Sequence, residues 1–267
     1  MKRQIRQLIN RFPRLKKLLK QAMQFLLPGQ GVSTHYMEVT QAEAGSESVR
    51  LRAAWKDDEL PVRQRELVDK QLAAYRRGEA VDVFDVLVKS LRELQGGTGA
   101  MRVLEIGCSS GYYSEVFRIA GLDVIYTGCD YSDAFIAMAM QRHPGLQFDV
   151  QDATALKYAD NAYDVVISGC CLLHIPEYQA AVAETARIAS QYAIFHRTPV
   201  VLGQQNKYYR KQAYGVEAIE IHFNEPHFLQ LLADSGLELL STHTLDETVS
   251  QGVGNATRTY VCRRKAA

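Results

Sequence analysis

The segment Val103-Leu104-Glu105-Ile106-Gly107-Cys108-Ser109-Ser110-Gly111-Tyr112-Tyr113-Ser114 decides the fold of this chain. It reads as an apolar strand, a turn of small residues and the first turn of a helix. This combination brings backbone N–H groups and a helix N-terminus close to a ligand. The strand ends on an acid, Glu105, two residues before the first glycine. Because a carboxylate there would repel phosphates, we expect the loop to bind a ligand that carries a cation.

Three interpretations of this loop compete. The pattern acid-x-Gly-x-small-x-Gly suits S-adenosylmethionine (SAM), which carries an ammonium and a sulfonium. A dinucleotide loop requires Gly-x-Gly-x-x-Gly, and this chain has Ser109 and Tyr112 where the later glycines belong. The third pattern, Gly-x-Ser-x-Gly, would make Ser109 the nucleophile of a serine hydrolase. That fold needs several strands upstream, whereas residues 1–95 read as helical and polar, so we favour the SAM loop and keep the hydrolase as an alternative.

Length and composition indicate one large globular domain, alone or with a helical extension. The chain has 267 residues, 47% of them hydrophobic and 23% charged. It contains no run of 18 apolar residues and no signal-peptide core, so we predict a cytoplasmic protein without a membrane span. The five cysteines are odd in number and lack Cys-x-x-Cys spacing, which favours reduced thiols.

Residues 1–31 form a separate basic arm with apolar residues at helical spacing. Residues 1–25 hold eight basic residues and no acid, which leaves 23 basic and 30 acidic residues in the remainder. One interpretation is an interfacial helix, with residues 1–27 touching an anionic membrane from its inner face. The other is a helix that packs on its own domain. We expect no nucleic-acid partner, because aromatic residues are not interleaved with the charge.

The rest of the chain predicts an α/β domain with helices ahead of it. Residues 32–50 are polar and read as a linker, and residues 51–94 read as lid helices, so that 32–95 forms one region. From residue 96 to 267 strands alternate with helices, which predicts a Rossmann-like, seven-stranded, mostly parallel sheet. The strands are expected at Arg102–Ile106, Asp123–Cys129, Gln147–Val150, Tyr163–Ser168, Tyr192–His196, Leu237–Thr244 and Thr257–Arg263. The last two have no helix between them and should form an antiparallel hairpin.

Ligands of parallel sheets bind at the carboxyl ends of the strands. The polar residues expected at these ends are Glu105, Asp130, Asp152, Ser168 and His196. Asp130 follows the loop by about twenty residues, the place from which an acid accepts both ribose hydroxyls. Asp152 follows the third strand, where it can accept from an adenine amino group.

These motifs, in this order, resemble the class I SAM-dependent methyltransferases from about residue 85 to the end, so residues 96–267 are interpreted as the methyltransferase domain and SAM as its cofactor. The resemblance implies Glu105 beside the amino-acid moiety, Asp130 on the ribose, and Asp152 at the adenine. It also implies a cofactor-binding role for Gly107, Ser109, Gly111, Tyr131, Ala153 and Ser168. Ser109 departs from the family, in which glycine is commoner, and narrows the space beside the cofactor.

Four stretches also resemble a branch of methyltransferases found beside bacterial glycan and lipopolysaccharide genes. They are Gly107–Tyr113, Ser168–His174, His196–Pro199 and Ala213–Glu217. This finer resemblance favours O-methylation of a saccharide or glycolipid, a small-molecule or glycan acceptor. A non-catalytic SAM-binding protein that docks on a membrane or partner through its basic arm is the remaining alternative.

A hydroxyl acceptor needs a base, and two histidines are candidates. His174 lies one turn past the fourth strand and His196 ends the fifth, and histidine suits base catalysis near neutral pH. The aromatic and basic segment 206–215 follows the fifth strand and suits sugar faces and anionic groups. The predicted acceptor-binding residues are Arg197, Tyr208, Tyr209 and Tyr214. No group of His, Cys and carboxylates has metal-ligand spacing, so we predict no metal.

Overall fold

The computed structural model describes residues 33–95, 99–203, 205–250 and 252–265. The chain divides into two compact units, Met1–Thr34 and His35–Ala267, and the second holds the sheet and its helices. The predicted basic arm, residues 1–31, lies outside the described residues, so its helices and its membrane contact stay predictions.

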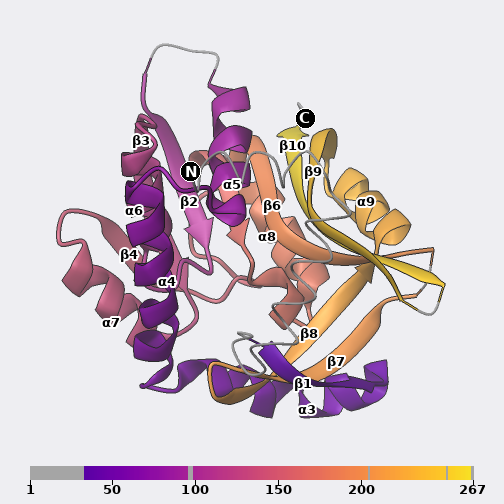
Figure 1. The fold of residues 1–267 in the computed structure, drawn as a ribbon. Coiled ribbons are helices and arrows are strands. Elements are labelled where there is room, and N and C mark those ends of the chain that lie inside the picture. Colours follow the sequence, from indigo (N-terminus) through magenta and orange to yellow (C-terminus); the bar gives the residue numbers. More distant parts are fainter. Residues whose placement is uncertain (1–32, 96–98, 204, 251, 266–267) are drawn as a thin grey trace, which may run out of the picture. The chain divides into compact units, whose positions relative to one another are not determined.

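The described part of the chain forms a ten-stranded sheet in the order β1-β7-β8-β6-β5-β2-β3-β4, with β10 and β9 branching off at β6 (Figure 1). Strands β2 to β6 and β8 pair in parallel, whereas the β7–β8, β6–β10 and β9–β10 pairs are antiparallel. The strands are β1 Ser33–Val39, β2 Met101–Ile106, β3 Val124–Asp130, β4 Gln147–Val150, β5 Tyr163–Gly169, β6 Ala189–Leu202, β7 Lys207–Ala213, β8 Val216–Asn224, β9 Leu237–Ser250 and β10 Val253–Arg264.

The parallel core and the closing hairpin were both predicted, and the structure confirms them. The sheet nevertheless has three more strands than the seven expected. Segment 206–215, for which no strand was predicted, supplies β7, and β8 follows it. These strands join because β6 continues past His196 and pairs with β8 through Val200 and Val201. The extension was missed because Pro199 reads as a strand stop, although a proline is tolerated where the sheet branches.

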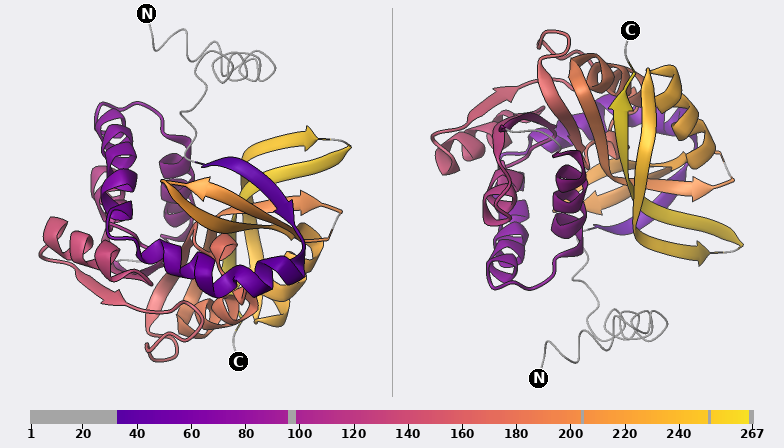
Figure 2. Two further views of the ribbon diagram at one scale, coloured as in Figure 1. Left: turned by 90° about the horizontal axis from the view of Figure 1, so that it is seen from below. Right: turned by 90° about the horizontal axis from the view of Figure 1, so that it is seen from above.

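Helices cover both faces of the sheet (Figures 1 and 2). Side chains alternate between two buried clusters along the strands: Val103 and Val165 pack with helices α4 to α7, and Leu104 and Val166 with α8 and α9. The α-helices are α3 Gln41–Ala53, α4 Leu60–Arg76, α5 Asp82–Leu94, α6 Tyr112–Ile119, α7 Asp133–Arg142, α8 Tyr178–Ile188 and α9 Glu225–Asp234. Short 3-10 turns η1 and η2 span Ala54–Lys56 and Leu172–His174.

The expected linker at residues 32–50 is instead ordered structure. Residues 33–39 form β1, and Thr40 opens α3 with a capping box: its hydroxyl accepts from the Glu43 N–H, while its own N–H donates to the Glu43 carboxylate at 2.7 Å. The segment looked like a linker because only a few of its side chains, among them Ala44 and Ser48, are buried.

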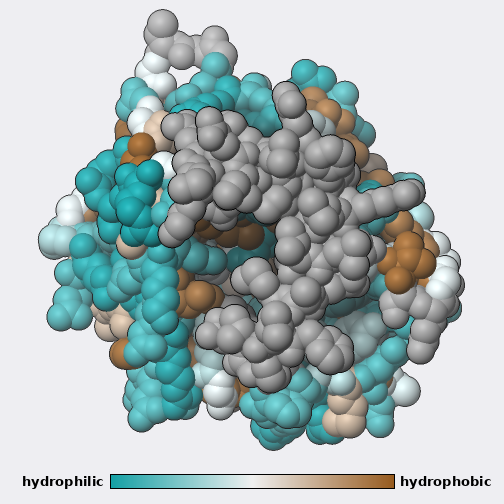
Figure 3. All heavy atoms as spheres, in the orientation of Figure 1, coloured by the Kyte–Doolittle hydropathy of each residue, from teal (hydrophilic) through white to brown (hydrophobic). Residues whose placement is uncertain are grey.

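The exposed sides of the lid helices are polar. Figure 3 shows the solvent-facing side of α4 as a hydrophilic surface. Among the described residues, no helix is both long enough and apolar enough to cross a bilayer.

Candidate active site

Two glycines shape the loop between β2 and α6. Gly107 and Gly111 have φ of 74° and 70°, a left-handed conformation that a side chain disfavours. A Cβ on Gly107 would lie 2.5 Å from Cys171 Cβ, and a Cβ on Gly111 would lie 2.7 Å from the Phe148 ring. The loop therefore packs closely against Cys171, which follows β5, and against Phe148 of β4.

Glu105 is a buried acid without a cation. Its side chain accepts a hydrogen bond from the Tyr126 hydroxyl at 2.5 Å, and the residue is 1% exposed. Burial raises the pKa of this carboxyl to about 8, an effect that the Tyr126 hydrogen bond opposes and the Asp130 charge reinforces. Gly169 lies against it, since a Cβ there would meet Glu105 Oε1 at 2.7 Å.

Asp130 and Ser109 form the next part of the site. The Asp130 carboxylate accepts from the Ser109 N–H at 2.9 Å and from the Ser132 N–H at 3.0 Å, each on a different oxygen. Burial raises the pKa of Asp130, against the lowering effect of these amides. The Ser109 hydroxyl is buried and has no partner. Each Asp130 oxygen retains a lone pair for a ligand hydroxyl, as the predicted ribose contact requires.

Asp152 is engaged differently from the prediction. One of its oxygens accepts from the N–H and hydroxyl of Thr154, at 2.9 and 2.7 Å, and the other from Arg52 at 2.6 Å. Burial alone would raise the pKa of Asp152, but these hydrogen bonds lower it below its usual value. Its neighbour Ala153 packs in the core. Asp152 therefore holds helix α3 in place through Arg52. Near Asp152, backbone groups rather than this carboxylate would recognise an adenine.

The segment α3–η1 reaches over the strand ends. Arg52 and Lys56 lie 5.0 and 4.2 Å from the centre of the Tyr131 ring, a cation–π arrangement. The Trp55 ring lies 4.5 Å from that of His174, and its indole N–H is buried without a partner. A lid was predicted in this part of the chain, and Arg52 and Lys56 are its contacts that the sequence did not reveal.

His174 has one free ring nitrogen. Its Nδ1 lies 2.5 Å from the carbonyl oxygen of Ile219, and since a carbonyl only accepts, Nδ1 carries the proton. Burial, together with the charge of Lys211, lowers the pKa of His174 to about 3. The ring is therefore neutral, and its Nε2 is a hydrogen-bond acceptor.

A buried charge cluster stands behind His174 on β7 and β8. Lys211 and His222 both contact the Glu220 carboxylate, His222 at 2.7 Å. Burial alone would raise the pKa of Glu220, but the His222 hydrogen bond and the Lys211 charge lower it to about 2. The Tyr209 ring packs on His222, with centroids 4.8 Å apart. This cluster fixes the wall from which Ile219 orients His174.

The structure corrects the role expected for His196. This residue is 1% exposed, and its two ring nitrogens lie 2.9 Å from the Tyr113 and Thr259 hydroxyls. Burial lowers the pKa of His196 far below its usual value, and the Arg197 charge adds to this. A ring with both nitrogens engaged below the surface cannot contact an acceptor. His196 is instead a support beneath the site.

Of the remaining predicted residues, one lies in the core and the others lie in or near the site. Tyr208 is buried in the core, so its predicted acceptor contact is wrong. The Ser168 hydroxyl faces the Cys171 thiol at 3.5 Å. Tyr214 and Arg197 lie within electrostatic range of each other, and the Tyr214 carbonyl accepts from Arg63 at 3.2 Å. Arg197 therefore stays in the site with Tyr214, and Tyr209 lies beside its wall.

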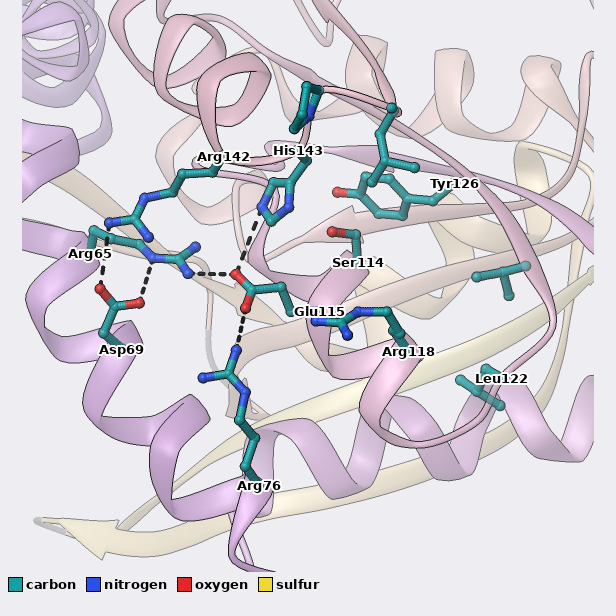
Figure 4. A pocket seen from close by; sticks show the side chains of 14 residues that line it. Arg65, Asp69, Arg76, Ser114, Glu115, Arg118, Leu122, Tyr126, Arg142 and His143 are labelled. Carbon is teal, nitrogen blue, oxygen red and sulfur yellow. Dashed lines mark hydrogen bonds and ion pairs between the residues drawn. The ribbon is translucent and has the colours of Figure 1, made fainter.

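A polar groove of about 690 Å³ lies behind the loop, between α4, α6 and the end of α7. Figure 4 shows Arg65, Arg76 and His143 converging on Glu115, with Arg65 and Arg76 both 2.5 Å from the carboxylate. Arg65 also donates to the Ser110 hydroxyl at 3.3 Å. This network ties the lid helix α4 to the loop from its outer side.

The site fits SAM in two respects. Ser109 has a buried hydroxyl without a partner, and it lies beside Asp130, which can accept from two ligand hydroxyls. Glu105 is a buried acid that could pair with a ligand cation. Among the described residues, no three His, Cys, Asp or Glu side chains group as metal ligands. The five cysteines are free thiols.

Residues 104–195 match the family described as a methyltransferase domain. Over that part of the chain, the match agrees with the predicted resemblance to methyltransferases. The demethylmenaquinone methyltransferase of Renibacterium salmoninarum is 36% identical over 93 residues, covering 35% of this chain and 38% of the relative. The fatty-acid O-methyltransferase of Mycolicibacterium smegmatis is 27% identical over 165 residues, covering 60% of this chain and 52% of the relative. The chain thus spans well under two thirds of either relative.

Solved structures confirm the fold. A SAM-dependent methyltransferase from Methanosarcina mazei has a TM-score of 0.50 at 19% identity, covering 66% of this chain and 98% of its own. The Burkholderia thailandensis 1,6-didemethyltoxoflavin-N1-methyltransferase, solved with its substrate and S-adenosylhomocysteine, has a TM-score of 0.50 at 14% identity and covers 85% and 87%. These likenesses concern the fold alone.

Proposed function

We propose that the protein is a SAM-dependent methyltransferase that methylates a hydroxyl of a small saccharide or glycolipid. The observation that carries this proposal is the pairing of a cofactor loop bearing Glu105 and Asp130 with a neutral His174 whose Nε2 is free. A hydroxyl acceptor has a proton to lose, and a neutral imidazole can take it.

The residues of the site have separate roles in this proposal. SAM would supply a methyl group on its sulfonium. Glu105, Asp130 and the glycine loop would hold it, and α3–η1 would exclude water through Arg52 and Trp55. The acceptor hydroxyl becomes strongly acidic as its oxygen takes the methyl group from sulfur, so His174 Nε2 would accept its proton despite the low pKa of this ring and then release that proton to solvent. Positioning supplies most of the acceleration of such an in-line displacement.

Aromatic side chains support the saccharide part of the proposal. Trp55 packs on His174, Tyr214 lies within electrostatic range of Arg197, and Trp55 offers an unpaired indole N–H. Rings of this kind present an apolar face with a polar edge, which matches the two-sided character of a sugar.

Product chemistry tests the proposal. The purified protein would be incubated with methyl-labelled SAM and with separate pools of nucleotide sugars, lipid-linked glycans and free fatty acids. We expect label in the sugar-containing pools, as an ether that withstands mild alkali. Label released by mild alkali would indicate a methyl ester, and label on nitrogen would indicate an amine acceptor; either result would overturn the hydroxyl proposal.

The lipid-linked form of the acceptor also involves residues 1–27. Their charge and apolar spacing support peripheral contact with an anionic membrane. Flotation of the full chain with anionic vesicles at low salt tests this, and failure to float would remove the membrane from the proposal.

A further inference from the structure

Arg197 lies on a β-bulge, which changes the direction of its side chain relative to a regular strand. Phe195 of β6 pairs with Tyr260 of β10, but Thr198 pairs with Arg258, so two residues on β6 face Thr259 alone. Arg197 is the second of the two and has φ of 59°. A bulge with a non-glycine residue in this conformation costs free energy, and such features gather at functional sites.

The bulge is held in place from below. The Thr259 hydroxyl lies 2.9 Å from His196 Nδ1 and accepts from the Arg197 N–H at 3.4 Å, and Thr259 is fully buried. The other His196 nitrogen lies 2.9 Å from the Tyr113 hydroxyl. The polar groups beneath Arg197 are thus paired with one another, and none of them forms a hydrogen bond with the Arg197 guanidinium.

The guanidinium has no acidic partner in the part of the chain that the structure describes. The groups that act on it are the Cys170 thiol and the phenols of Tyr112, Tyr113 and Tyr214. Cys170 follows Gly169, which pairs with His196, so Cys170 and Arg197 come next on adjacent strands. An arginine placed among such groups is costly unless a ligand supplies an anion.

Glu105 lies at the same edge of the sheet, and its carboxyl has no cationic partner among the described residues. Its carboxyl faces Tyr126 and the Asp130 charge, and no cation is among the groups acting on it. Glu105 lies against Gly169, the residue before Cys170. Both Glu105 and Arg197 lie within electrostatic range of the Tyr112 and Tyr113 hydroxyls, so the two groups share the same neighbours.

We propose that Arg197 is a cofactor-binding residue, and that Arg197 and Glu105 together hold the amino-acid end of SAM, with its carboxylate on Arg197 and its ammonium on Glu105. A zwitterion supplies an anion for Arg197 and a cation for Glu105 at the same time. This inference rests on the proposed function for its choice of cofactor, and it moves Arg197 from the acceptor side, where the sequence analysis expected it.

Two ligands test the proposal by calorimetry. S-adenosylhomocysteine has the amino-acid end, whereas 5′-methylthioadenosine keeps the adenosine and the sulfur but lacks it. We expect Arg197→Met to weaken S-adenosylhomocysteine ~10–100-fold, the usual range for a charge-assisted hydrogen bond. Arg197→Lys should recover part of the loss. The affinity for 5′-methylthioadenosine should stay within about twofold, which also shows that the variant is folded.

Two controls complete the experiment. Arg263→Met removes an exposed arginine that pairs with Glu238 on β9, and it should change neither affinity. The double variant Glu105→Gln with Arg197→Met should bind the two ligands about equally. If Arg197→Met binds S-adenosylhomocysteine like the wild type, or weakens both ligands alike, the inference is overturned. If the wild type binds neither ligand, the proposed function itself fails.

Discussion

The two halves of the site are built in different ways. The cofactor half, at the ends of β2, β3 and β4, carries the acids Glu105, Asp130 and Asp152 within fifty residues of chain. The proposed acceptor half draws on β5, β6, β8 and α3 and holds the neutral His174, while Arg197 on its β6 bulge is proposed to reach the cofactor. The first half rests on short loops, the second on contacts such as His196 with Thr259, 63 residues apart. Changes in the two halves should therefore separate cofactor affinity from turnover.

The largest expected effect separates the halves through His174. His174→Ala should lower kcat by ~10²–10⁴ while the affinity for S-adenosylhomocysteine stays within a few-fold, because the role proposed for His174 is that of a base and not of a cofactor ligand. Steady-state kinetics on an identified acceptor and calorimetry measure the two quantities. Undiminished kcat in this variant would remove the base role.

A substitution in the cofactor half should instead lower the affinity for the cofactor. Asp130→Ala should weaken S-adenosylhomocysteine by on the order of 1–3 kcal/mol, the scale of hydrogen bonds to a charged group. Asp133→Ala is the matched control, since Asp133 is an exposed acid at the start of the next helix. An Asp130→Ala protein with wild-type affinity would show that Asp130 serves only the loop amides.

The pH dependence of cofactor affinity reports on Glu105. Its pKa of about 8 in the free protein means that it is protonated at neutral pH, while the ligand ammonium favours the carboxylate. Binding should release a proton, so the affinity should rise by up to about tenfold per pH unit between pH 6 and 8. Calorimetry in buffers of different ionisation enthalpy measures the released proton, and Glu105→Gln should abolish it.

The same shift has a consequence for stability. A carboxyl whose pKa is raised on folding stabilises the protein fully below its unfolded value and loses that contribution as the pH rises through about 8. The free wild type should therefore lose stability between about pH 5 and 8 relative to Glu105→Gln. Parallel denaturation curves across this pH window would contradict the buried position of Glu105.

The smallest expected effect concerns the lid that spans both halves. Arg52→Met removes the contact with Asp152, which is partly solvent-exposed, so S-adenosylhomocysteine should dissociate only about two- to fivefold faster. Arg50→Met, at an exposed site on the same helix, is the control. An unchanged dissociation rate in Arg52→Met would mean that α3 does not close over the cofactor.

The cofactor half could be predicted from the sequence because its signals are local. Glu105, Gly107, Gly111 and Asp130 lie on loops whose positions follow from the strand that precedes each one. The bulge at Arg197 could not be predicted, because it depends on Thr259, whose pairing register is set by the whole sheet. Tyr208 was misplaced for a related reason: no strand was predicted where β7 forms, and alternation along β7 turns Tyr208 into the core.

The most direct test of the account is calorimetry of the wild-type protein with S-adenosylhomocysteine and with NAD, without added metal. Glu105, Asp130 and the glycine loop predict that S-adenosylhomocysteine binds at a single site and that NAD does not, since its pyrophosphate would meet a carboxylate at the loop. Binding of NAD without binding of S-adenosylhomocysteine would contradict the account.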